Sequence, residues 1–174
     1  GRDYTSLSAW NAGEQQDLTD SGGDIAIAEC YSMEDATPAS ISGWVTNSTC
    51  YILVKGADSD RTPTNTGIWS TSRYRMVTTS ARNVTGCVDP DEEYCRFENL
   101  QFANDANGNS WCYDLLVGPG VDTANSDIRV SGCIFLKSGL DALEFYGVAP
   151  RANTTSQIII FNNIFYDFLN HTSG

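Results

Sequence analysis

The stretch "IRVSGCIFLKSG" at residues 128–139 has two relatives in the same chain, "IIIFNNIFYDF" at 158–168 and "CRFENLQFAN" at 95–104. Aligned, they place similar residues in the columns Phe97/Val130/Ile160, Asn99/Gly132/Asn162, Leu100/Cys133/Asn163 and Phe102/Phe135/Phe165. The spacing is 33 residues from Phe97 to Val130 and 30 residues from Val130 to Ile160. A repeat of this length, with one residue class in each column, predicts a solenoid of stacked coils.

The chain has the size and composition of one soluble-type domain. Its 174 residues are 41% hydrophobic and 18% charged, enough to bury a single core. Its 22 acidic against 10 basic side chains give a net charge of −12, which repels phosphate backbones and argues against a nucleic-acid partner. No apolar run is long enough to predict a membrane span.

Strand signals dominate the chain. Short runs rich in β-branched and aromatic residues, bounded by turn residues, occur at 24–31, 40–46, 50–56, 73–80, 111–117 and 142–148. Only "SLSAWNAGEQQD" at 6–17 predicts a helix, with Ser6 or Ser8 as its N-cap. We therefore expect a single all-β domain over residues 1–174, with an N-terminal cap at 1–20 and coils at 24–168.

The columns also predict where side chains point. Stacked strands lie roughly 4.8 Å apart, so Phe102, Phe135 and Phe165 are expected to form an internal aromatic stack. Asn99 and Asn162 are expected to bend the chain at a corner. Arg96 and Arg129 share a column, and we expect their side chains to form a ladder on the exterior of the coils.

Several of these stretches together resemble the right-handed parallel β-helix repeat proteins, the pectin-lyase-like chains of secreted bacterial and phage proteins. The resemblance rests on the stretches "DYTSLSAWNAGEQQDLT", "DIAIAECY", "ISGWVT…YILVKGA", "IRVSGCIF" and "IIIFNNIFYDF", and covers nearly all of the chain. It implies three parallel sheets wound into about four to six coils, with the opening helix capping the first coil. It implies little about chemistry, because this fold carries lyases, hydrolases, tailspikes, adhesins and stalks.

Two classes of function follow. We expect a structural or recognition module outside the cell, or at a cell or virion surface, that projects, adheres or assembles. The alternative is a polysaccharide lyase, a glycoside hydrolase or a tailspike-type glycan binder. The sequence predicts no cap after the last coil, and an uncapped β-helix exposes unpaired strands, so we expect either that the natural chain continues or that another copy completes the stack by end-to-end association. A glycan is a candidate ligand.

Six cysteines without metal-site spacing favour disulfides and an oxidising compartment. Cys87 and Cys95 are expected to bond to each other, because seven intervening residues, one of them Pro90, readily return the chain. The pairing of the other cysteines stays open, namely Cys30, Cys50, Cys112 and Cys133.

The segment "CVDPDEEYC" at 87–95 also holds four carboxylates, those of Asp89, Asp91, Glu92 and Glu93. Carboxylate oxygens suit calcium, so these residues are a metal candidate, but a solvated acidic turn is the favoured interpretation. No other cofactor is expected.

Four Asn-x-Ser/Thr triplets occur, at Asn47, Asn83, Asn153 and Asn170. Asn47 and Asn153 lie in turn-like polar stretches and are expected to carry glycans first, in a host with the machinery.

No catalytic set emerges from the sequence. Asp141 and Glu144 are close in sequence, but a turn and a strand separate them, so their convergence is not assured. The lone His171 lies in the last four residues, which leaves a nucleophile–histidine–acid set poorly supported. Trp69, Tyr74 and Trp111 could stack on sugars, although such aromatic residues more often cover core. The sequence therefore favours a module without catalysis.

Overall fold

A computed structural model of the chain describes residues 3–20, 23–57, 67–79, 86–104, 111–117, 126–137, 144–150 and 157–166, with the backbone alone described for 111–117, 137 and 144–150. Within these ranges the chain forms one helix, α1 (Leu7–Glu14), and fourteen strands. The strands pair in parallel throughout, in three sheets. The all-β expectation with parallel pairing is confirmed.

Each sheet collects every third strand of the chain. The first sheet, which we call sheet B, has the order β1 (Ala26–Cys30), β4 (Ile52–Gly56), β7 (Tyr94–Glu98), β10 (Asp127–Ser131) and β13 (Gln157–Phe161). Sheet C has the order β14 (Ile164–Tyr166), β11 (Ile134–Lys137), β8 (Gln101–Asn104), β5 (Arg75–Thr78) and β2 (Glu34–Asp35). Sheet D has the order β12 (Glu144–Pro150), β9 (Trp111–Val117), β6 (Val88–Pro90) and β3 (Ala39–Ile41).

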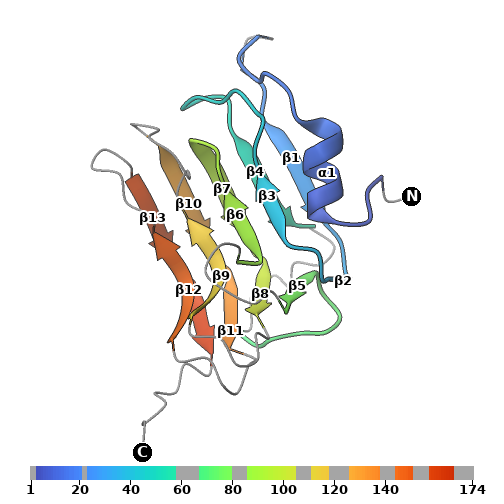
Figure 1. The fold of residues 1–174 in the computed structure, drawn as a ribbon, viewed down its shortest axis with the longest axis vertical. Coiled ribbons are helices and arrows are strands. Elements are labelled where there is room, and N and C mark those ends of the chain that lie inside the picture. The colour runs from blue at the N-terminus through green and yellow to red at the C-terminus, as the bar shows by residue number, and fades with distance from the viewer. Residues whose placement is uncertain are drawn as a thin grey trace, which may run out of the picture.

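The chain therefore adds one strand to sheet B, then one to sheet C and then one to sheet D. We call each such set of three strands a circuit. Among the described residues four circuits are complete, and β13 and β14 add a fifth strand to sheets B and C. Figure 1 shows the strands of sheet B side by side, with α1 next to β1 and β13 at the far side. This arrangement is compatible with a β-helix.

The three sequence repeats lie in register. Phe97 is opposite Val130, and Val130 is opposite Ile160. Phe102, Phe135 and Phe165 align in the same way in sheet C, with ring centroids 5.4 and 5.0 Å apart in stacked pairs. The predicted aromatic stack is confirmed.

The corner between sheets B and C is built from the predicted Asn/Gly/Asn column. Asn99, Gly132 and Asn162 have φ of 56°, 63° and 55°, a left-handed conformation that glycine and asparagine tolerate best. At the next position, the Asn163 amide donates to the Val130 carbonyl at 2.9 Å and accepts from the Cys133 amide at 2.8 Å. This side chain ties the last circuit to the one before it.

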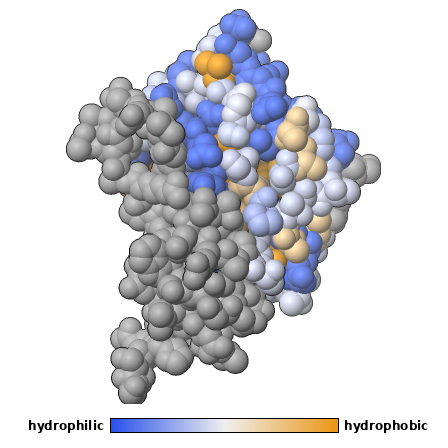
Figure 2. Space-filling model, in the orientation of Figure 1, coloured by the Kyte–Doolittle hydropathy of each residue, from blue (hydrophilic) through white to orange (hydrophobic). Residues whose placement is uncertain are grey.

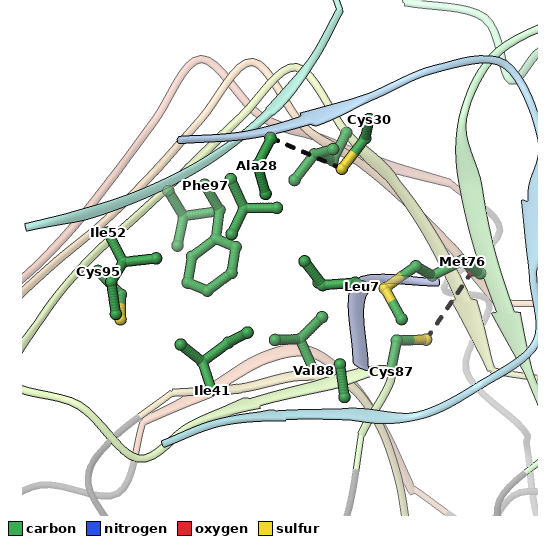
Figure 3. Close-up of a cluster of buried hydrophobic side chains, with 14 of the residues drawn as sticks. Leu7, Ala28, Cys30, Ile41, Ile52, Met76, Cys87, Val88, Cys95 and Phe97 are labelled. Carbon is green, nitrogen blue, oxygen red and sulfur yellow. Dashed lines mark hydrogen bonds between the residues drawn. The ribbon is translucent and has the colours of Figure 1, made fainter. Parts of the chain in front are cut away.

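The core fills the space between the three sheets. Figure 3 shows side chains from all three walls pointing into one interior, among them Phe97 of sheet B, Met76 of sheet C and Val88 of sheet D. Leu7 of α1 enters the same cluster and is 3% exposed, so the helix closes this end of the interior. Ser6 is the N-cap, since its hydroxyl accepts from the Ala9 amide at 3.0 Å.

The predicted Cys87–Cys95 disulfide is contradicted, because both residues are buried cysteines that form no disulfide. Cys87 precedes β6 and its Sγ lies 3.2 Å from the Ala103 carbonyl of sheet C, whereas Cys95 points inward from β7 of sheet B. The two side chains thus serve different walls of the core. Cys30, Cys50 and Cys133 are also buried free thiols, and the side chain of Cys112 lies outside the described residues.

Candidate functional site

A groove of about 870 Å³ lies between the N-terminal segment with α1 on one side and β1 on the other. The residues that line it come from the start of the chain, from β1 and the segment after it, and from the approach to β5: Asp3, Tyr4, Ser6, Leu7, Trp10, Glu14, Ile27, Ala28, Glu29, Cys30, Tyr31, Met33 and Tyr74. The lining combines aromatic, acidic and apolar side chains.

A buried carboxylate fixes the helix that forms one wall. Asp35 of β2 is 2% exposed and accepts from the Leu7 amide at 2.8 Å and from the Tyr74 hydroxyl at 3.0 Å. A carboxylate at the first turn of a helix satisfies an amide that has no partner within the helix. Burial raises the pKa of Tyr74 well above 10.0, so its hydroxyl keeps the proton that it donates.

Two tryptophan contacts fix the middle of α1. Trp10 stacks on Trp44 with ring centroids 5.3 Å apart, and the Trp44 indole donates to Asn11 at 2.7 Å. Trp44 lies within the stretch 40–46 that the sequence reads as a strand. The strand β3 instead ends at Ile41, since Gly43 has a φ of 85° and turns Trp44 toward the helix.

The acidic side chains at the groove already have partners. Glu29 forms an ion pair with Lys55 at 2.9 Å and accepts from the Tyr31 hydroxyl at 3.0 Å. Glu14 accepts from the Tyr4 hydroxyl, and this hydrogen bond raises the pKa of Tyr4. Cys30 is the groove's thiol, and burial raises its pKa from 9.0 to about 12, which keeps it protonated and poorly nucleophilic at neutral pH.

The groove runs along the outermost strand of sheet B. On its inner side β1 pairs with β4. The Ala26 amide donates to the Tyr51 carbonyl at 3.1 Å. No other strand of the described chain pairs with the opposite edge of β1. Ile25, Ile27 and Tyr31 are 41%, 48% and 42% exposed there. Such a strand edge beside a hollow suits an extended peptide backbone better than a compact cofactor.

The four calcium candidates do not form a metal cluster. Asp89 is buried in β6, Asp91 accepts from the Ser40 hydroxyl at 3.0 Å, and Glu92 accepts from the Trp44 amide at 2.8 Å. Burial raises the pKa of Glu92, while its backbone hydrogen bonds oppose that shift. Glu93 is half-buried. Within the described residues no group of three or more His, Cys, Asp or Glu side chains could hold a metal ion. The favoured solvated turn is also wrong for Asp89, which lies in a strand.

Asn47 is the one glycosylation candidate within the described residues, since Asn83, Asn153 and Asn170 lie outside them. Its Oδ1 accepts from the amides of Thr49 at 2.8 Å and Cys50 at 2.9 Å. The side chain is half-exposed in this turn, and its amide nitrogen, the atom that would carry a glycan, is not used in these bonds.

The remaining sequence candidates are dispersed. Tyr74 is buried, as the interpretation of aromatic residues as core cover expects, and Trp69 is half-buried. Arg96 lies opposite Arg129 on the outside of sheet B, stacked 3.4 Å above the Tyr51 ring, while Arg129 pairs with Asp127 at 2.6 Å. The exterior ladder is confirmed. Asp141, His171 and the side chains of Glu144 and Trp111 lie outside the description.

Comparison with known proteins gives no relative to reason from: no family model, no curated protein and no solved structure matches this chain. No helix in the described ranges is long and apolar enough to cross a membrane. Hydrophilic residues dominate the upper part of the described surface in Figure 2, with only small hydrophobic patches.

Proposed function

We propose that this chain is a right-handed parallel β-helix of the pectin-lyase-like kind and serves as a structural or recognition module. In this proposal it works outside the cell, or at a cell or virion surface, and joins end to end with further copies. The rotation of the chain through three parallel sheets and the straight residue columns support the architecture. The half-exposed sequon turn at Asn47 is compatible with that location, whereas the free state of the described thiols removes the disulfide argument for it.

One observation supports the proposed assembly. Val130 and Phe135 are 0% exposed, yet the residues in the same columns of the next circuit, Ile160 and Phe165, are 43% and 48% exposed. A further circuit placed on β13 and β14 would bury these side chains, gaining roughly 1 kcal/mol for each half-covered residue. It would also satisfy the backbone groups along the outer edges of both strands.

The symmetry of such a contact predicts its product. The surface at β13 and β14 differs from the surface at α1 and β1, so a contact between them joins different patches on two copies. Heterologous contacts give rings when the rotation closes and filaments when it does not. A stack along the direction in which the circuits accumulate favours the filament.

The groove supports this role over an enzymatic one. A glycosidase needs two carboxyl groups that converge on the substrate. At the groove, Glu14 and Glu29 are engaged with Tyr4 and Lys55, and the Cys30 thiol stays protonated. A glycan or an extended peptide could bind such a surface, but none of these groups is poised as a general base.

Light scattering coupled to size-exclusion chromatography tests the proposal on the purified 174-residue chain. We expect a mass above the 19.0 kDa of one copy, rising with concentration through the micromolar range. Ile160→Asp/Phe165→Asp should restore the monomer, because it places charges in the contact. Leu53→Asp is the control, since Leu53 points outward from β4, which is paired with a strand on both sides. A stable wild-type monomer at these concentrations ends the assembly proposal.

A further inference from the structure

The hydrogen-bond pattern of sheet B determines which backbone groups lie at its first edge. The Ala26 amide donates to Tyr51 at 3.1 Å, and the Cys30 carbonyl accepts from Ala57 at 2.9 Å. Even-numbered residues of β1 therefore bond toward β4. In a strand, alternate residues direct these groups to opposite sides, so the amide and carbonyl of Ile27 point into the groove.

The last strand of the sheet has the opposite pattern. The Gln157 amide donates to the Ser126 carbonyl at 2.7 Å, so the odd-numbered residues of β13 bond back toward β10. The amide and carbonyl groups of Ile158 and Ile160 point away from the sheet. The two edges of sheet B are thus complementary. The outward backbone amides and carbonyls of β13 could pair with the outward amide and carbonyl of Ile27 in a parallel β1.

We propose that β13 of one copy adds in parallel to β1 of the next copy, within the groove beside α1. This inference rests on the proposed end-to-end assembly and specifies its contact. Every pair in sheet B keeps its columns straight, from Ala26–Ile52 through Cys95–Ile128 to Ile128–Ile158. The same register at the junction places Ile159 opposite the neighbour's Ile27 and Ile160 opposite the neighbour's Ala28.

Side-chain size suits this register. Ala26 and Ala28, the first two of the three inward residues of β1, are small and leave room at the edge of the core, whereas Ile158 and Ile160 are large inward residues of β13. Ile27, 48% exposed at the groove, would meet Ile159 on the outer face. Both faces of the added strand would then contact apolar side chains.

Charge does not oppose insertion of this strand into the groove. Residues 157–166 include no Asp, Glu, Lys or Arg. At the groove, Lys55 neutralises Glu29 at 2.9 Å, and the Tyr4 hydroxyl bonds to Glu14. An uncharged apolar strand therefore brings no like charge against these carboxylates.

Disulfide trapping tests the register. In the Ile27→Cys/Ile159→Cys variant each junction would place two cysteines directly opposite on the outer face, within the Cα separation of roughly 4.4–6.8 Å that a disulfide needs. Mild oxidation should give a ladder of covalent multimers on a non-reducing gel. The parent chain should give no ladder from its five described native cysteines, because they are buried.

The control is Ile25→Cys/Ile159→Cys, which displaces one cysteine by two residues along the strand and should not cross-link. Wild-type assembly in light scattering, with no ladder from Ile27→Cys/Ile159→Cys or with equal ladders from both variants, overturns this contact and leaves the proposed assembly standing. A monomeric wild-type chain overturns both. Circular dichroism of the two variants should match the parent chain, because Ile25 and Ile27 are exposed and Ile159 is half-buried.

Discussion

At the corner between sheets B and C, Gly132 is the residue that tolerates a side chain least. Its φ is 63°, and a Cβ built there would lie 2.5 Å from Oδ1 of Asn99 in the preceding circuit. Glycine therefore suits this position for two reasons: it adopts the left-handed φ without strain, and it leaves room for the Asn99 side chain. Asn162 holds the same conformation at φ 55° but is exposed.

Gly132→Ala should lower the free energy of unfolding by about 1–3 kcal/mol, because it adds left-handed strain and a clash with Asn99. Asn162→Gly is the control and should change it much less, since glycine adopts the same φ without strain. Urea unfolding followed by circular dichroism measures both. Equal effects of the two substitutions would show that the corner does not require this geometry.

Buried thiols should make the fold sensitive to alkali. Burial raises the pKa of Cys95 well above 9.0, and it raises the pKa values of Cys30 and Cys133 from 9.0 to about 12 in the folded state. Between these values the folded chain holds protons that the unfolded chain has lost, so stability is fully present below pH 9 and falls as pH rises toward 12, by about 1.4 kcal/mol per pH unit for each thiol. Urea midpoints at pH 8 and pH 10 test this. Cys133→Ala should flatten the decline, and an unchanged slope would contradict it.

At the scale of the element, the phenylalanine stack shows how a column binds successive circuits together. Phe135 lies between Phe102 and Phe165 and is fully buried, whereas Phe165 is half-exposed. Phe135→Ala should cost about 3–5 kcal/mol of unfolding free energy, because it leaves a cavity between two rings. Phe165→Ala, measured at a concentration too low for assembly, should cost clearly less. Comparable losses in urea unfolding would mean that the last circuit is covered in the single chain.

The sequence predicted those elements that repeat. The columns of residues 95–104, 128–139 and 158–168 predicted parallel stacking, the Asn/Gly/Asn corner and the inward phenylalanines, because each circuit imposes the same environment on the same column. The sequence predicted the strands of the first two circuits less well. β2 and β6 have only two and three residues, too few to show an alternation, and an acidic stretch concealed the buried Asp89.

At the scale of the whole molecule, the groove could not be predicted from the sequence, because its walls come from the N-terminal segment, β1 and Tyr74, which converge only when the chain has folded. One signal was present: in "DIAIAECY" the exposed Ile25 and Ile27 alternate with the small residues Ala26 and Ala28. Large apolar residues outside and small ones inside are unusual for a covered strand. The disulfide prediction was wrong for a related reason. Closeness in sequence did not reveal that the side chains of Cys87 and Cys95 pack against different walls of the core.

The net charge of each copy should control the assembly of the whole molecule. Two copies that each carry −12 repel each other, and the attraction proposed here is apolar and backbone-mediated, so it does not weaken as charges are screened. The screening length falls from about 30 Å at 0.01 M salt to about 8 Å at 0.15 M. The mass measured by light scattering should therefore rise with sodium chloride concentration. Asp3→Asn/Asp24→Asn, which removes two exposed charges near β1, should move that rise to lower salt. A mass that falls as salt is added would point instead to a contact made by ion pairs.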